Sequence, residues 1–178
     1  MVTYHDTVVQ IGDPVLRTVA QPVPISDIST PKIQRIIMDM LAVLEKEEDG
    51  AALAAPQIGV PLRIFVLAQK VFGPGSSHRA ASNDSHLVFI NPEITRRSRR
   101  QAPLEEGCLS VRGRYGTINR HQRVTVRAYD ERGMQFVRGA SGLLAQAFQH
   151  ECDHLNGTLF VDHAFETWDV KKHSDREP

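Results

Sequence analysis

The sequence predicts one domain, residues 1–178, that combines two α-helices with several β-strands, and three observations support this prediction. Apolar side chains recur at helical spacing in residues 31–44 and again in residues 143–155. Residues 122–129 alternate polar and apolar side chains, and a turn at 130–133 leads into a second apolar run, as in a β-hairpin. No repeat or linker divides the chain, and its length suits one hydrophobic core.

The composition excludes several classes of protein. The 21 Lys and Arg residues balance the 21 Asp and Glu residues, so no overall field attracts nucleic acid or an anionic membrane. No apolar run approaches the ~20 residues of a membrane span, and Met1–Asp6 lacks a signal-peptide pattern. Two cysteines do not make a secreted disulfide framework. We therefore expect a cytoplasmic protein, bacterial or in an organelle matrix after loss of a presequence, with no specific nucleic-acid partner and no membrane partner.

The first elements along the chain are an apolar arm and a helix. Residues 8–17 form the arm, which a Gly-Asp-Pro turn interrupts, and we expect it to pack on the core. Thr30 is the expected N-cap and Pro31 the first residue of the helix, which Gly50 is expected to end. The helix carries an apolar stripe at Ile33, Ile36, Ile37, Met40, Leu41 and Leu44.

A block of small residues follows at positions 50–57, where six of eight are Gly, Ala or Pro. Small side chains let a ligand approach the backbone closely. Gln57 is the one polar side chain of the block, and its NH₂ group can donate to a developing oxyanion. The alternative is a tight loop in which Gln57 caps a neighbour. Residues 63–67 and 87–90 are expected strands, separated by a polar loop at 72–84.

The strongest motif is H-E-x-x-H, formed by His150, Glu151 and His154. The two histidines are four positions apart, so on a helix they share one face and can bind one metal ion. Glu151 lies within reach of a water on that ion and can act as its general base. The alternative is a helix with two solvated histidines. The helical context supports the metal, because Ser141 suits the N-cap and Gly157 the left-handed C′ position.

Two histidines leave a catalytic metal one protein ligand short, because such sites carry three ligands plus water. The register H-x-x-G-x-x-H fails at Phe160, and the downstream candidates Glu166 and Glu177 leave little room for a second packed helix. Cys108, between a glycine and a polar turn, is the candidate for the missing ligand. Cys152 lies two residues from each histidine, so we expect it to face away and to pack in the core.

Three blocks in order, at 50–57, 106–110 and 149–154, make the chain similar to the peptide deformylase family. The resemblance extends from Val9 to Asp162. It implies an α+β fold, in which antiparallel β-sheets pack around a central metal-binding helix carrying HExxH, with an N-terminal helix. It also implies a metal-dependent hydrolase that removes the formyl group from the N-terminal formyl-methionine of newly synthesised proteins and releases formate.

The resemblance also assigns the catalytic residues. The metal ligands of the family fall on Cys108, His150 and His154, and its general base falls on Glu151. The expected cofactor is one divalent metal ion. Fe²⁺ is the expected native ion, and Zn²⁺, Ni²⁺ or Co²⁺ can take its place.

The family's oxyanion donors fall on the Gln57 side chain and the Leu109 backbone N–H. Ala52 departs from the family pattern Gly-x-Gly-Leu-Ala-Ala-Pro-Gln, which has glycine there. A methyl group at this position narrows the cleft and would be strained if φ were positive. The methionine side chain of a substrate needs an unbranched apolar slot. The residues expected to bind substrate are Gly50, Ala51, Ala52, Leu104, Gly107, Leu143 and Ala147.

The partners that the resemblance implies are nascent formyl-methionyl polypeptides and, transiently, the ribosome. Residues 96–100 contain four arginines, and the balanced charge elsewhere favours a solvated strand or loop edge over an RNA-binding patch. Residues 163–178 are expected to form a peripheral C-terminal tail.

Two other classes of protein stay open at this point. A metallopeptidase that cleaves internal peptide bonds would take its third ligand from Glu166 or His163 and would not need Cys108. A structural zinc protein would need a fourth protein ligand, from Cys152 or another histidine, and would leave Glu151 without a role.

Overall fold

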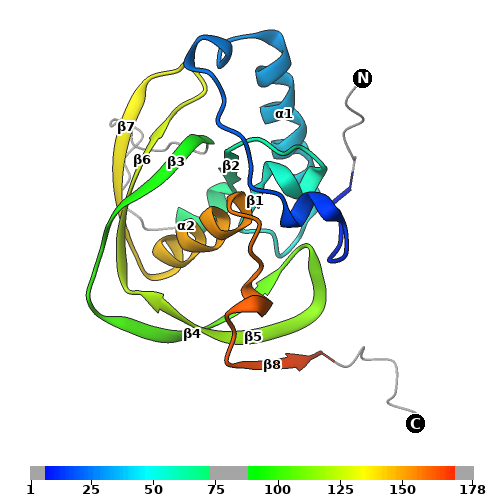
Figure 1. Cartoon of the computed structure of the whole chain (residues 1–178), viewed down its shortest axis with the longest axis vertical. Coiled ribbons are helices and arrows are strands. Elements are labelled where there is room, and N and C mark those ends of the chain that lie inside the picture. Colours follow the sequence, from blue (N-terminus) through cyan, green and yellow to red (C-terminus); the bar gives the residue numbers. More distant parts are fainter. Residues whose placement is uncertain (1–6, 73–87, 171–178) are drawn as a thin grey trace.

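Two antiparallel β-sheets pack around the central helix α2 (Figure 1). The computed structural model describes residues 7–72 and 88–170, so the loop at 73–84 and the tail at 171–178 lie outside it. The helices are α1 (Pro31–Lys46) and α2 (Gly142–Leu155), with 3-10 turns η1 (Pro14–Arg17), η2 (Ile25–Asp27), η3 (Ala55–Ile58), η4 (Gln69–Phe72) and η5 (Phe160–Asp162). The larger sheet has the order β1 (Ala52–Ala54), β2 (Ile64–Leu67), β3 (Val88–Arg97), β6 (Arg123–Tyr129), β7 (Gln135–Ser141). The smaller sheet has the order β4 (Gln101–Cys108), β5 (Val111–His121), β8 (Glu166–Asp169). This architecture confirms the α+β fold class.

The larger sheet separates two apolar clusters, one beneath each helix. Along β2, Ile64 belongs to the cluster of α1 and Phe65 to that of α2, because successive side chains of a strand point to opposite faces. Phe65 stacks on Phe89 with ring centroids 4.5 Å apart, and Phe148 of α2 packs 5.0 Å from Phe89. Burying a phenylalanine ring fully contributes roughly 1.5–3 kcal/mol. Phe148 therefore anchors α2 on the sheet.

Helix α1 begins as the sequence predicts but ends earlier. Pro31 is its first residue and Thr30 occupies the N-cap position, although the threonine hydroxyl donates to a carbonyl of the preceding turn (2.6 Å). The helix ends at Lys46, so the prediction that Gly50 ends it was wrong. Glycine is needed at position 50 for a different reason: a Cβ there would lie 2.8 Å from Leu44 Cδ1.

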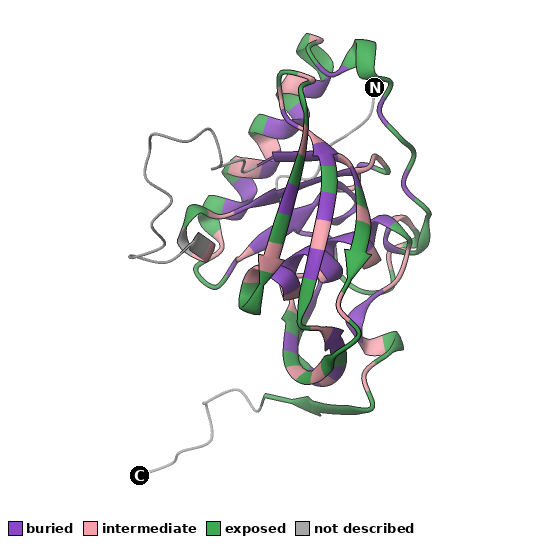
Figure 2. Ribbon diagram, turned by 90° about the vertical axis from the view of Figure 1, so that its left-hand side faces the viewer, coloured by how far each residue is buried: buried purple, intermediate pink, exposed green. Residues whose placement is uncertain are grey.

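Strand β3 is longer than the apolar run that predicted it. The run ends at Ile90, but β3 continues to Arg97 in antiparallel pairing with β6. Register shifts on both sides of Glu93 break the alternation of side chains, so the second half of the strand has no period-two signature. In β6 the predicted alternation is confirmed, with Val126 buried and Arg127 exposed. Figure 2 shows buried and exposed residues alternating along strands of the protein.

The smaller sheet includes part of the segment expected to be a peripheral tail. Residues 166–169 form the edge strand β8, which pairs with residues 114–117 of β5. Arg114 Nε donates to Asp169 Oδ1 at 2.8 Å and so ties the end of β8 to β5. All four residues of β8 are exposed, so this strand adds an edge to the sheet and no core. The single-domain organisation of residues 1–178 stays a prediction.

Helix α2 begins and ends where the sequence predicts. Ser141 is its N-cap residue, as predicted. Gly157 adopts φ 73°, the predicted left-handed conformation, and a Cβ there would lie 2.7 Å from the Arg17 carbonyl oxygen. The N-terminal arm packs on the core as expected and bonds to the blocks at 50–57 and 106–110: Val9 N–H donates to Gln57 O (2.9 Å) and Ile11 N–H to Ser110 O (2.7 Å). The arm thus holds the loop of Gln57 against the turn after β4.

Among the described residues, no helix has the length and apolar content that crossing a membrane requires.

Candidate metal centre

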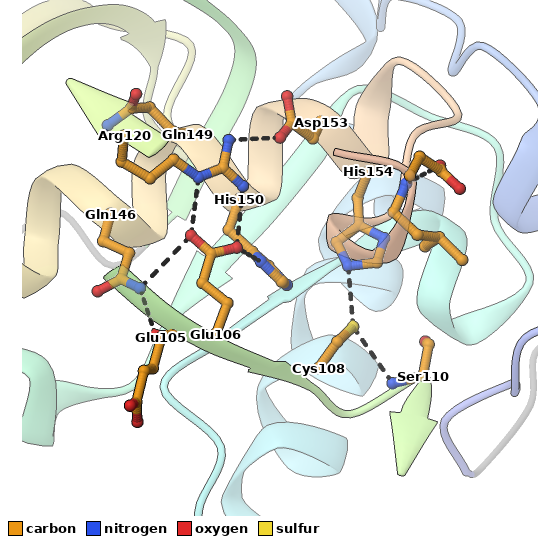
Figure 3. Close-up of polar contacts among 12 residues, drawn as sticks. Glu105, Glu106, Cys108, Ser110, Arg120, Gln146, Gln149, His150, Asp153 and His154 are labelled. Carbon is orange, nitrogen blue, oxygen red and sulfur yellow. Dashed lines mark hydrogen bonds and ion pairs between the residues drawn. The ribbon is translucent and has the colours of Figure 1, made fainter. Parts of the chain in front are cut away.

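Three side chains converge between the smaller sheet and helix α2 (Figure 3). Cys108 is the last residue of β4, whereas His150 and His154 lie one turn apart on α2. One ligand atom from each of the three lies within 4.8 Å of the others, and Cys108 Sγ is 3.1 Å from His154 Nε2. Within the described part of the chain, neither Glu166, His163 nor Cys152 belongs to such a group.

The donor set suits a divalent transition metal. A thiolate and two imidazoles are the ligands that zinc and iron prefer, and three protein ligands leave a coordination position open for water. Burial opposes ionisation of Cys108, but the facing His154 and His150 outweigh burial and hold the pKa of the thiol well below its ordinary value. The site therefore favours the thiolate, which is the form that ligates metal.

A buried ion pair orients His150. Glu106 Oε2 accepts from His150 Nδ1 at 2.9 Å, so the other ring nitrogen, Nε2, is left for the metal. The same carboxylate accepts two hydrogen bonds from the Arg120 guanidinium, at 2.7 and 2.9 Å. Both side chains are buried, with 3% of Glu106 and 8% of Arg120 exposed. Burial opposes ionisation of Glu106, but Arg120 and His150 overcome it and lower the pKa to about 2.

Sequence reasoning missed this ion pair. Glu106 lies two residues before Cys108, and a carboxylate beside a candidate ligand is a signal that could have identified it. No local sequence pattern distinguishes Arg120, because it is one of several arginines in the strands of the protein. Its guanidinium also donates to Asp153 Oδ2 at 2.6 Å, which links β5 to α2 next to the second histidine ligand.

Glu151 occupies a buried position beside the ligands. Its side chain is 3% exposed, and its Oε2 atom has no hydrogen-bond partner within the described residues. Burial raises the pKa of Glu151 to about 7, against the opposing effect of the two nearby imidazoles. A carboxyl group with a pKa near 7 can both accept and return a proton at neutral pH.

Gln57 is held with its amide nitrogen toward the ligands. Its Oε1 accepts the Ala54 N–H at 2.8 Å, so the NH₂ group points the other way. That group donates to Ser110 Oγ at 3.2 Å and lies 3.7 Å from Cys108 Sγ. Gln57 therefore does both things that the sequence allowed. Its oxygen caps a neighbouring N–H, and its NH₂ group is oriented toward the metal site. Ser110 is a further positioning residue that sequence reasoning missed.

Two of the three ligands, Cys108 and His150, line a cleft of about 660 Å³. Two edge strands border it, since Ala52 of β1 and Gly107 of β4 both line its walls. The cleft is also lined by Gln57, Cys108, Leu109, His150 and Glu151. Of the residues expected to bind substrate, Ala51, Ala52, Gly107, Leu143 and Ala147 line the cleft, whereas Gly50 and Leu104 do not.

Ala52 fits its place without strain. Among the described residues, Asn91 is the one non-glycine residue with positive φ, so Ala52 has an ordinary strand conformation. Its methyl group is 8% exposed and packs in the apolar cluster of α2 with Leu67 and Ala147. The departure from glycine thus adds one methyl group to the wall between the cleft and the core.

Cys152 is a packing residue, as its position between the histidines predicts. It is 6% exposed within the cluster of Phe148 and Leu155, and burial raises the pKa of its thiol to about 12. A thiol in this state is a poor metal ligand.

A Cys-His-His set with an adjacent buried carboxylate, in an open cleft, is an arrangement typical of metal-dependent hydrolases. The polypeptide deformylase family model matches residues 5–168. The chain therefore belongs to the peptide deformylase family.

Several relatives are similar over most of the chain. Peptide deformylase 1A of Arabidopsis thaliana, chloroplastic/mitochondrial, is 42% identical over 87% of the chain and 60% of its own length. Peptide deformylase of Azotobacter vinelandii is 40% identical over 88% of the chain and 85% of its own length. The chain thus spans about six-tenths of the plant relatives' length, and more of the bacterial ones.

Solved structures give the same result. The peptide deformylase of Synechococcus elongatus in complex with actinonin has a TM-score of 0.73 and 37% identity, covering 88% of this chain and 77% of that one. A Met-Ala-Ser-bound class I type b peptide deformylase from Acinetobacter baumannii has a TM-score of 0.77 and 30% identity, covering 92% and 99%.

Proposed function

We propose that this chain is a peptide deformylase that hydrolyses the formamide of N-terminal formyl-methionine in newly synthesised proteins and releases formate. The observation that carries the proposal is the convergence of Cys108, His150 and His154 on one point, beside the buried carboxylate of Glu151 and at the floor of an open cleft. A divalent ion held by these three ligands would polarise a carbonyl and acidify a water molecule.

The remaining chemistry falls to the protein's own groups. Glu151 takes a proton from water, whose oxygen bonds to the formyl carbon. The Gln57 NH₂ group and the Leu109 N–H line the cleft beside Cys108, where they stabilise the negative charge that develops on the formyl oxygen. A single oxyanion donor of this kind is worth ~3–4 kcal/mol of barrier. The C–N bond then breaks, and Glu151 returns its proton to the leaving amine.

The cleft suits an extended peptide. β1 and β4 are edge strands of their sheets, so each has one side with no further strand of the sheet beside it among the described residues, where an extended chain can add. Leu143 and Ala147 of α2 line the cleft on the face of His150, where they form the apolar slot for the methionine side chain. The Met-Ala-Ser complex of the Acinetobacter relative supports this substrate class.

A formate-release assay on formyl-Met-Ala-Ser with metal-loaded protein tests the proposed function. Formate release that is lost in Glu151→Gln is the expected result. Cleavage of internal bonds in an unformylated peptide would instead indicate a metallopeptidase, and a metal-loaded protein without either activity would indicate a structural site.

For the metal, we propose Fe²⁺ as the native ion, with Zn²⁺, Ni²⁺ or Co²⁺ able to replace it. The mixed thiolate and imidazole set supports all four ions and excludes Mg²⁺ and Ca²⁺, which require oxygen ligands. Metal analysis of protein purified without oxygen tests this proposal, and zinc as the only ion recovered would contradict it.

For partners, we propose that the protein acts on nascent chains at the ribosome, in a bacterial cytoplasm or an organelle matrix. The arginines at 96–100 are exposed, and Ser98 stabilises their turn by accepting the Arg123 N–H (3.1 Å) and donating to the Arg100 carbonyl (2.8 Å). Such a cluster suits phosphate groups of RNA. Co-sedimentation with ribosomes should weaken as salt rises and in the Arg99→Glu/Arg100→Glu variant, and unchanged co-sedimentation would rule out this surface.

A further inference from the structure

Two exposed aromatic side chains continue the wall of the cleft across the smaller sheet. Gly107 of β4 pairs with Tyr115 of β5, and Tyr115 pairs with Trp168 of β8. Residues directly opposite in neighbouring strands share one face of a sheet, so these three form a row perpendicular to the strands. Tyr115 is 40% and Trp168 36% exposed.

The row begins at the metal site. Gly107 immediately precedes the ligand Cys108, and both Gly107 and Tyr115 line the cleft. The Tyr115 ring lies over Gly107, because a Cβ at position 107 would lie 2.7 Å from Tyr115 Cε1. Glycine therefore leaves the space beside the edge of β4 to the tyrosine ring, and any side chain at this position would displace it.

The aromatic pair is held in place from both ends of β8. The Phe165 N–H donates to the Thr117 carbonyl at 3.0 Å, and the Val170 N–H donates to the Gly113 carbonyl at 2.7 Å. Trp168 lies between these bonds, directly beside Tyr115. The segment expected to be a peripheral tail thus supports a residue of the cleft.

Successive side chains of a strand point to opposite faces of the sheet, and this alternation shows on which face Tyr115 and Trp168 lie. Glu106 points toward α2, where it bonds to His150, so Gly107 and Tyr115 lie on the opposite face of the smaller sheet. We consider a peptide that adds to the edge of β4 with its methionine side chain toward Leu143 and Ala147. Because side chains alternate along an extended chain, the side chain of its second residue points to the face of Tyr115. Gly107 offers no side chain to block that path.

We propose that Tyr115, with Trp168 opposite it on the neighbouring strand, is a subsite for the side chain of the residue that follows formyl-methionine, and that it favours aromatic residues there. The inference rests on the proposed deformylase function, and it assigns to this chain a preference in the second residue of the substrate. Aromatic pairs in offset or edge-to-face geometry stabilise a complex beyond the burial of their area. The competing explanation is that Trp168 only fastens β8 to β5.

The kinetic test compares two substrates. The wild-type enzyme should have a kcat/KM for formyl-Met-Phe-Ser roughly three- to tenfold above that for formyl-Met-Ala-Ser, the range expected for one aromatic pair. Tyr115→Ala should bring this ratio to about one, whatever its effect on kcat/KM for the alanine peptide, and Tyr115→Phe should retain the ratio. Phe165→Ala is the control, because it removes another exposed aromatic side chain, one that lies next to β8 and is absent from the lining of the cleft.

A second measurement needs neither catalysis nor a variant. Trp168 is the only tryptophan in the sequence, so its emission reports on this subsite alone. Titration with the product peptide Met-Phe-Ser should change the emission more strongly, and at lower concentration, than titration with Met-Ala-Ser.

Equal kcat/KM values for the two substrates together with equal emission changes would overturn the subsite, and so would a preference that persists in Tyr115→Ala. An enzyme that releases formate from neither peptide would overturn the proposed function instead. In that case the fluorescence titration still decides whether an aromatic side chain binds at Tyr115.

Discussion

Replacing Glu106 by glutamine should weaken both the fold and the metal site. Glu106→Gln removes the charge that accepts two hydrogen bonds from Arg120 and one from His150. Arg120 is 8% exposed, and after the change its remaining partner is the Asp153 carboxylate, which is 27% exposed. Breaking a buried ion pair by removing one partner costs about 3–5 kcal/mol. For a protein of this length, each kcal/mol lowers Tm by roughly 2–4 °C, so Tm of the metal-free protein should fall by roughly 6–20 °C.

The same substitution should loosen the metal through His150. Loss of a carboxylate that orients a histidine ligand typically costs 10- to 100-fold in metal affinity. Thermal unfolding of the apoprotein and competition with a chelator measure the two effects separately. Glu105→Gln is the control, because it makes the identical change at the adjacent, exposed glutamate. Glu106→Gln protein whose Tm and metal affinity match those of Glu105→Gln would refute the assigned role.

The pH dependence of stability follows from the same pair. The pKa of Glu106 falls from an ordinary 4.5 to about 2 in the folded protein, so the folded state binds fewer protons than the unfolded state between these values. The stabilisation is fully present above pH 4.5 and is lost as the pH falls toward 2. Denaturant titrations of the apoprotein should therefore show that the stability gap between wild type and Glu106→Gln narrows across this window. A gap independent of pH would contradict the linkage.

Three further substitutions test the site. Cys108→Ala should abolish stoichiometric metal binding and activity, whereas Cys152→Ala should retain both, as metal analysis will show; a full complement of tightly bound metal in Cys108→Ala would remove the cysteine from the ligand set. Glu151→Gln should keep the metal but lose roughly 10²–10⁴-fold in kcat, and an active variant would remove the proposed base. Ala147→Phe should fill the methionine slot and lower kcat/KM for formyl-Met peptides at least tenfold, or about 1.4 kcal/mol, with metal content unchanged; unaltered kinetics would place the slot elsewhere.

The sequence predicted the features that depend on residues close to one another along the chain. The period of α1, the N-cap at Thr30 and the left-handed Gly157 depend on neighbours in sequence, and the structure confirms each of them. The motif on α2 fixes the spacing of its two histidines for the same reason. Helix α1 ends before Gly50 because Glu47 adopts an extended conformation and a turn follows, in which the Gly50 N–H donates to the Glu47 carbonyl at 3.0 Å; the helical period does not predict such a turn.

Pairings across sheets could not be predicted from the sequence in this way. Glu106 and Arg120 are 14 positions apart on neighbouring strands, and their contact depends on the register of β4 with β5. Tyr115 and Trp168 meet only because β8 adds to that sheet. A period-two pattern gives the face of each residue but not the partner strand or its register.

The division of the ligands between a strand and a helix gives the metal a mechanical role. Cys108 and His154 are separated by 46 positions, and the intervening chain includes β5 and the β6–β7 hairpin. An ion bound to both closes this stretch into a loop, which lowers the conformational entropy of the unfolded chain much as a covalent crosslink would. Hydrogen exchange in β4 and β5 should therefore slow when the ion binds, even at amides far from the cleft. The proposed catalytic metal would then also hold the smaller sheet against the central helix.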